Sequence, residues 1–164
     1  MTLGEDDELI LNLLVIPELH LHTGIVNKLL SHLNTKWPYV YEWCHRYNIY
    51  VQEFRGKTLN GNSCKFALKF LDELEEEVPS EFSNIVTVLR AFDAIRKSCL
   101  SKKLLPSYNE DIEAFKAAYM ALGISITVKA HIIFDHLGYV LDREENGHGL
   151  GYYSEQARLA YIYF

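Results

Sequence analysis

Apolar residues recur at intervals of three and four along most of the chain, which is the period of an amphipathic helix. Residues 18–33 keep this period from Leu19 to Leu33, and six later stretches do the same. Each later stretch begins near a residue that can cap a helix N-terminus. The candidate caps are Thr35, Asn62, Ser80, Ser107, Thr127 and Ser154, and Gly123 is placed to end the helix before it.

Only two segments suggest extended structure. Residues 49–54 alternate apolar and polar side chains, which fits a short strand or an extended link. Residues 9–16 are nearly all apolar, and either a short buried strand or the first turns of a buried helix accounts for them. The sequence therefore predicts a mainly α fold. We expect a single-domain bundle of five to seven helices with at most two short strands over residues 1–164, with residues 1–8 as a flexible acidic N-terminus.

Composition and charge narrow the functional classes. Apolar residues make up 49% of the chain and charged residues 23%, the balance of a globular protein rather than a disordered one. The net charge of -6 disfavours a large phosphate-binding surface, because nucleic-acid affinity comes mainly from clustered Lys and Arg. The strongest phosphate-binding candidates are Arg96, Lys97, Lys102 and Lys103, although cations also favour a helix C-terminus for its dipole alone.

The cysteines and the N-terminus bear on the compartment. Cys44, Cys64 and Cys99 are odd in number and widely spaced, which is typical of a reduced intracellular protein. The acidic N-terminus lacks the basic start of a secretory signal, and residues 9–16 are too few to span a bilayer. We expect a protein of the nucleus or cytoplasm with no membrane partner. Its oligomeric state stays open.

Aromatic residues crowd one predicted helix. Trp37, Tyr41, Trp43 and Tyr47 could line a groove for a protein partner, but packing in the core is the commoner use of such a stripe. The loop over residues 142–151 is the other candidate recognition surface. Its Gly-x-Gly-x-Gly has no strand before it and so lacks the context of a phosphate-binding loop, and no Gly-x-Ser-x-Gly occurs.

Two groups of histidines raise the question of a metal site. His131 and His136 are five residues apart, so on a regular helix their rings point about 140° away from each other. A shared metal would require the helix to end between them. Glu18, His20 and His22 would share one face of an extended segment, but Pro17 favours a helix there, in which they diverge.

A set of short motifs spans most of the chain. They are Pro-x-Leu-His and a following Gly (Pro17, Leu19, His20, Gly24), Leu-Gly with Lys-x-His and a second His (Leu122, Gly123, Lys129, His131, His136), a Gly-rich loop (Gly149, Leu150, Gly151) and Ser-Glu-Gln (Ser154, Glu155, Gln156). In this order and spacing the chain resembles a family of transposon-derived proteins of animal genomes, particularly those of arthropods. That family is similar to the C-terminal part of a transposase with a ribonuclease H-like core.

The resemblance implies DNA cleavage by two metal ions, Mg²⁺ or Mn²⁺, held by carboxylates, one of them a Glu on a late helix. In relatives we expect that helix to carry a further Glu and a His after Ser-Glu-Gln. This sequence instead has Arg158, Leu159, Ala160, Tyr161 and Ile162. We also expect the strands that would carry an earlier catalytic Asp to be absent, because Pro-x-Leu-His comes close to the start of the sequence. Loss of one carboxylate normally abolishes two-metal chemistry, so we expect no catalytic residue and no cofactor.

The favoured hypothesis is a non-enzymatic transposase remnant that binds another protein or makes a weak contact with nucleic acid. The alternative is a metal-dependent nuclease with Glu18, His20, Asp135 and Glu155 as metal ligands. A stable fold without a selected function is the third possibility.

Overall fold

The computed structural model describes residues 18–54, 56–143 and 145–152. Six helical stretches run over 18–36, 40–46, 61–77, 80–100, 108–121 and 128–142, and a seventh begins at Leu150. No strand occurs in this part of the chain, and the predicted helical fold class is confirmed. The expectations for residues 1–8, residues 9–16, Pro17 and the last helix with Ser154 and Glu155 concern residues outside the described ranges.

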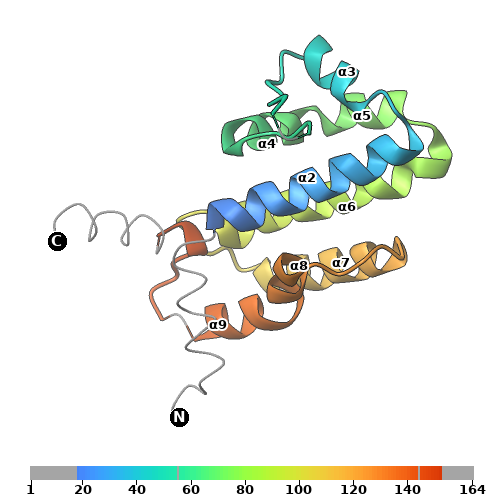
Figure 1. Ribbon diagram of the computed structural model, residues 1–164. Coiled ribbons are helices and arrows are strands. Elements are labelled where there is room, and N and C mark those ends of the chain that lie inside the picture. Colours follow the sequence, from blue (N-terminus) through green and yellow to red (C-terminus); the bar gives the residue numbers. More distant parts are fainter. Residues whose placement is uncertain (1–17, 55, 144, 153–164) are drawn as a thin grey trace, which may run out of the picture.

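The helices form three layers, with two long helices side by side in the middle (Figure 1). These are α2 (Glu18–Lys36) and α6 (Ser83–Ile95). One flank holds α3 (Val40–Arg46), α4 (Gly61–Ala67) and α5 (Leu71–Glu77), and the other holds α7 (Tyr108–Ala121), α8 (Val128–Ile132) and α9 (Gly138–Asp142). The 3₁₀ turns η1 (Leu68–Phe70) and η2 (Ser80–Phe82) and the π turns η3 (Arg96–Leu100) and η4 (Ile133–Leu137) complete these helices.

The helices share one apolar core. Its largest fully buried side chains are Trp43, Phe92, Phe115 and Tyr119, which come from the middle layer and both flanks. Phe92 of α6 packs on Phe115 of α7 with 5.7 Å between ring centroids, and Phe115 packs in turn on Tyr119 and Phe134. Burial of one connected apolar cluster makes the described part of the chain a single compact body.

Several predicted helix boundaries need correction. Thr35 is not an N-cap, because α2 continues to Lys36 and the Thr35 hydroxyl donates to the His32 carbonyl. Asn60 rather than Asn62 caps α4, since its side chain accepts from the Ser63 amide. Ser80 opens the 3₁₀ turn η2 without a side-chain cap bond, and α6 begins only at Ser83.

Other boundaries follow the prediction. Gly123 has φ +68° after the end of α7, the left-handed conformation that Gly adopts at helix ends. Thr127 caps α8 by accepting from the Ala130 amide. Residues 49–54 are the extended link rather than a strand, with one isolated bridge between Gln52 and Thr58.

The three thiols are buried inside this fold. Cys44 lies in α3, Cys64 in α4 and Cys99 in η3, and none of them is in a disulfide. Burial in apolar surroundings raises the pKa of each thiol to about 12. The structure also has no helix, in the part it describes, that is both long and apolar enough to cross a bilayer.

The Gly-rich loop packs with its backbone directly on the end of η3. The Gly149 amide donates to the Lys102 carbonyl at 2.8 Å, and the Gly151 amide donates to the Ser101 carbonyl at 3.1 Å. A Cβ at Gly149 would lie 2.2 Å from the Ser101 carbonyl oxygen. These glycines therefore permit close backbone packing, and their amides are used within the fold instead of facing an anion.

A Gly149→Ala substitution is expected to destabilise the protein by about 2 kcal/mol, because the loop must move away from η3 and its amide bonds weaken. Urea unfolding would measure the loss. Gly56→Ala is the control, since Gly56 has φ +86° but no atom within 4 Å of the added Cβ, and it should cost only about 1 kcal/mol of backbone strain. Equal losses in the two variants would contradict steric packing at Gly149.

Candidate functional site

Two histidine rings meet on the surface of the 128–142 helix. The Nε2 atoms of His131 and His136 are 3.2 Å apart, and the ring centroids are 5.0 Å apart. Nδ1 of His131 lies 2.8 Å from one carboxylate oxygen of Asp135, and Nζ of Lys116 lies 3.2 Å from the other. Because Lys116 belongs to α7, the cluster joins two helices and is held from both sides.

The expectation that His131 and His136 diverge is wrong. It assumed a regular α-helix, whereas the π turn η4 (Ile133–Leu137) begins two residues after His131 and includes His136. A π turn accommodates one more residue than an α turn, so side chains five apart fall on the same face. Ile133, Phe134 and Leu137 of this turn are buried, and their packing holds the widened turn in place.

The carboxylates of a two-metal nuclease do not converge in the described residues. Within 18–54, 56–143 and 145–152, no three His, Cys, Asp or Glu side chains lie close enough to hold one metal ion. Glu18 is in the first turn of α2 with His20 exposed beside it, while Asp135 is on η4 and already faces His131 and Lys116. Glu155 lies outside the described ranges. A Mg²⁺ or Mn²⁺ pair therefore does not fit the residues described.

The cations predicted to bind phosphate are in part neutralised by their own helix. Arg96 and Lys97 reach the same carboxylate, that of Asp93, at 2.8 and 3.1 Å. Lys102 and Lys103 are exposed on the segment that follows η3, where the Gly-rich loop packs. Because Arg96 and Lys97 share the negative charge of Asp93, the four cations together make a weaker anion site than the sequence suggests.

A different group of cations lies on the surface formed by α2 and α8. Lys28, His32 and Lys36 recur every four residues on the solvent side of α2, and Lys129 of α8 lines the same groove as Lys28. In the part of the chain that the structure describes, no ion pair involves Lys28, Lys36 or Lys129. Burial, Lys36 and Lys28 each lower the pKa of His32. We call these four residues the basic face.

The basic face borders a groove between α2 and α8. The groove has a volume of about 460 Å³ and is lined by Gly24, Asn27, Lys28, Ser31, Thr127, Val128 and Lys129. Lys129 lies across Gly24, since a Cβ there would be 2.4 Å from Cδ and 2.7 Å from Nζ of Lys129. Lys28 Nζ lies 3.2 Å from the Ser125 hydroxyl on the loop before α8. Gly24 thus lets a second lysine approach α2.

Comparison of the chain with protein-family models, curated proteins and solved structures finds no match. The resemblance to transposon-derived proteins therefore stays a prediction. Two of the motifs that carry it meet in space, because Gly24 of the first lies under Lys129 of the second.

The aromatic residues predicted either to bind a partner or to fill the core lie mainly in the core. Trp43 has no exposed surface, Tyr41 is buried, and Trp37 and Tyr47 are half-buried against the same core. Tyr47 packs on Trp43 at 5.5 Å and on Phe70 at 5.0 Å between centroids. These side chains join α3 to η1 and do not form an exposed aromatic surface.

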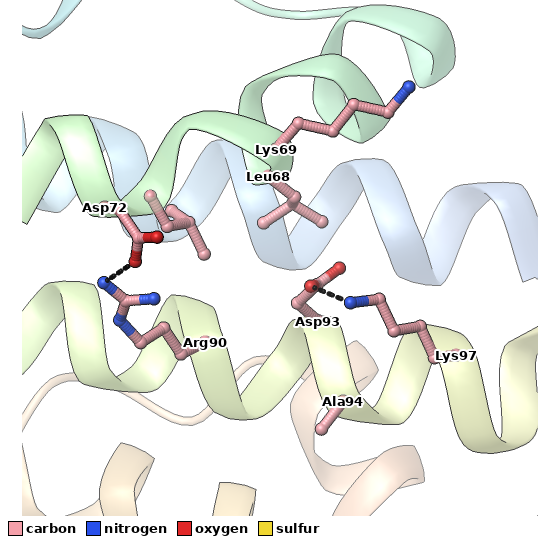
Figure 2. Close-up of a pocket in the computed structure, with 8 residues that line it drawn as sticks. Leu68, Lys69, Asp72, Arg90, Asp93, Ala94 and Lys97 are labelled. Atoms are coloured by element: carbon pink, nitrogen blue, oxygen red, sulfur yellow. Dashed lines mark ion pairs between the residues drawn. The ribbon is translucent and has the colours of Figure 1, made fainter.

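A second groove, between η1–α5 and α6, contains charges of both signs (Figure 2). It has a volume of about 330 Å³. Arg90 lies 2.7 Å from both Asp72 and Glu75, and Lys97 is paired with Asp93. The pairing of these cations within the groove leaves it less suited to an anion than the α2–α8 groove.

A signal for the basic face exists in the sequence and was missed. Residues 19–41 and residues 114–134 contain no Asp or Glu, although the chain as a whole is acidic. These two stretches include all of α2 after Glu18 and all of α8, and the two helices pack together. Charge counted by segment, in place of the net charge of the chain, would have indicated a basic surface at their junction.

Proposed function

We propose that this chain is a non-enzymatic nucleic-acid-binding protein, derived from a transposase, that holds a phosphate backbone on its basic face. The observation that carries the proposal is the grouping of Lys28, Lys36 and Lys129 on one surface, with no carboxylate paired to any of them in the described residues. A cation that is already paired within the protein gains little free energy by binding a phosphate. When an unpaired cation binds, counterions are released from the nucleic acid, and this release favours the complex.

The spacing of these cations suits an extended polyanion. Lys28 and Lys36 are eight residues apart on one helix, which separates their positions by about 12 Å along its axis. One strand of B-DNA advances about 3.4 Å per nucleotide, so this interval spans three to four phosphates. Lys129 widens the contact to one side, and the exposed Ser31 between the lysines adds a hydroxyl donor to phosphate oxygens.

The binding is expected to be weak and governed by salt. Three or four cations predict a slope of about -3 for log K against log salt concentration. The net charge of -6 opposes the contact outside the basic face. We expect the lysines to contact phosphates, and phosphate contacts carry no sequence information, so we expect no strong sequence preference.

Fluorescence anisotropy with labelled double- and single-stranded DNA and RNA tests the proposal at about 20 and 150 mM salt. The Lys28→Gln/Lys129→Gln double variant is expected to weaken binding by about tenfold at the lower concentration and to reduce the salt slope by nearly 2. The substitutions remove two cations of the groove without adding bulk, so the unfolding midpoint should stay the same.

The matched control is Lys57→Gln/Lys69→Gln, which brings the net charge to the same value through two exposed lysines of another surface. That variant should bind like the parent protein. Binding that falls equally in both double variants would mean a general charge effect. No binding of the parent protein at the lower salt concentration would reject the proposed function.

A further inference from the structure

We propose that His131 and His136 form a binding site for one divalent transition-metal ion of the copper, nickel and zinc group. The two Nε2 atoms are 3.2 Å apart. An ion with tetrahedral ligands and metal–nitrogen bonds of 2.0–2.1 Å holds two such nitrogens about 3.3 Å apart. An ion can therefore take the place of the hydrogen bond between the rings at nearly the same Nε2–Nε2 distance, once the proton shared by the two Nε2 atoms has moved away and both rings have turned towards the ion.

Asp135 prepares His131 for this role. Its carboxylate lies 2.8 Å from Nδ1 of His131, which places the ring proton on Nδ1 and leaves the lone pair on Nε2, the atom that faces His136. Metal-binding histidines typically donate their second nitrogen to a carboxylate in this way. The other carboxylate oxygen of Asp135 is 3.2 Å from Lys116, so Asp135 orients the histidine and is not itself a ligand.

The distance between the rings is set by the fold. His131 lies just before η4 and His136 lies within it. The η4 residues Ile133 and Leu137 are fully buried. The rings themselves face solvent, with the His131 side chain 55% exposed, so water can complete the coordination of an ion. π turns are rare and frequently occur at functional sites.

The ligand atoms select the type of ion. Imidazole nitrogens suit copper, nickel and zinc, whereas Mg²⁺ and Mn²⁺ prefer carboxylate, carbonyl and water oxygens. The site has only two protein ligands. Among the residues that the structure describes, no group of three His, Cys, Asp or Glu side chains could hold a metal ion. The two proposed ligands are not part of the basic face, so the variants that test one proposal leave the residues of the other unchanged.

Isothermal titration of the untagged full chain, stripped of metal, with Cu²⁺, Ni²⁺, Zn²⁺ and Mg²⁺ at neutral pH tests the proposal. We expect one ion per chain for the first three metals and no binding of Mg²⁺. His131→Gln and His136→Gln should each abolish that stoichiometric binding. Asp135→Asn should weaken it by about 10- to 100-fold, as loss of a carboxylate behind a histidine ligand does.

Two further measurements separate this site from binding elsewhere. His45→Gln removes an exposed histidine distant from η4 in sequence and should leave the affinity unchanged. The electron paramagnetic resonance spectrum of the Cu²⁺-loaded protein should show coupling to two nitrogens, and this signal should be absent from either histidine variant. Unchanged binding in His131→Gln or His136→Gln, or an equal loss in His45→Gln, would overturn the proposal.

Discussion

The free energy of unfolding is expected to fall by roughly 3 kcal/mol as the pH is lowered from 6.5 to 4, and His22 to be the main cause. His22 is a fully buried side chain of α2, stacked on Phe92 with 5.8 Å between ring centroids. Neither of its ring nitrogens has a hydrogen-bond partner within the described structure. The ring must therefore be neutral in the folded protein.

The sign of the effect follows from the pKa of His22. Burial is the main cause that lowers this pKa from 6.5 to about 4, and the positive charges of Lys65 and Arg96 contribute to the same shift. Between these values the unfolded chain binds a proton that the folded protein does not. The contribution of His22 to stability is thus complete above pH 6.5 and is lost as the pH falls towards 4.

Urea unfolding of the parent protein and of His22→Leu across this pH range measures the effect. The variant should lose most of the pH dependence and should be as stable as the parent protein, or more so, at pH 7, since it removes two buried nitrogens that lack partners. His45→Gln, a substitution of an exposed histidine, should keep the parent profile. If His22→Leu also keeps it, another group governs the acid transition.

A Phe92→Ala substitution is expected to destabilise the protein by about 3–5 kcal/mol. Phe92 has no exposed surface, and its ring is the link between His22 of α2 and Phe115 of α7. Its loss leaves a cavity between the middle layer and one flank, which the surrounding helices cannot close without losing their own contacts. In a chain of this size that is a large share of the total stability.

Chemical unfolding with an unchanged dependence on urea concentration would identify this loss as one of core packing. Phe54→Ala serves as the comparison, because Phe54 is 89% exposed and its removal should change stability by less than about 0.5 kcal/mol. A Phe92→Ala protein within 1 kcal/mol of the parent would contradict the central place of this ring.

The helical fold was predictable because its signals are local. The apolar face of α6 appears in the sequence as Ile85, Val88, Leu89 and Phe92, and all four are buried. Gly123 and Thr127 could be assigned because a left-handed Gly and a capping hydroxyl act within one turn. The neighbouring Asn60 and Asn62 could not be told apart, since both can cap and only the path of the chain selects one.

The cluster around His131 was not predictable from spacing. The buried residues Ile132, Ile133, Phe134 and Leu137 give almost the same apolar pattern in an α turn and in a π turn. One added residue per turn changes which polar side chains meet without changing which apolar ones are buried. The basic face was missed for a different reason, because the net charge of a chain conceals how its charges are divided between segments.

The three buried thiols allow local unfolding of the protein to be measured at three positions. Cys44, Cys64 and Cys99 lie in three separate helical stretches, and a thiol with a pKa of about 12 is almost wholly protonated and unreactive at neutral pH. Alkylating reagents can then modify each cysteine only when its own helix detaches from the core. The rates at the three positions give three local free energies of opening in the unmodified chain, without any engineered probe.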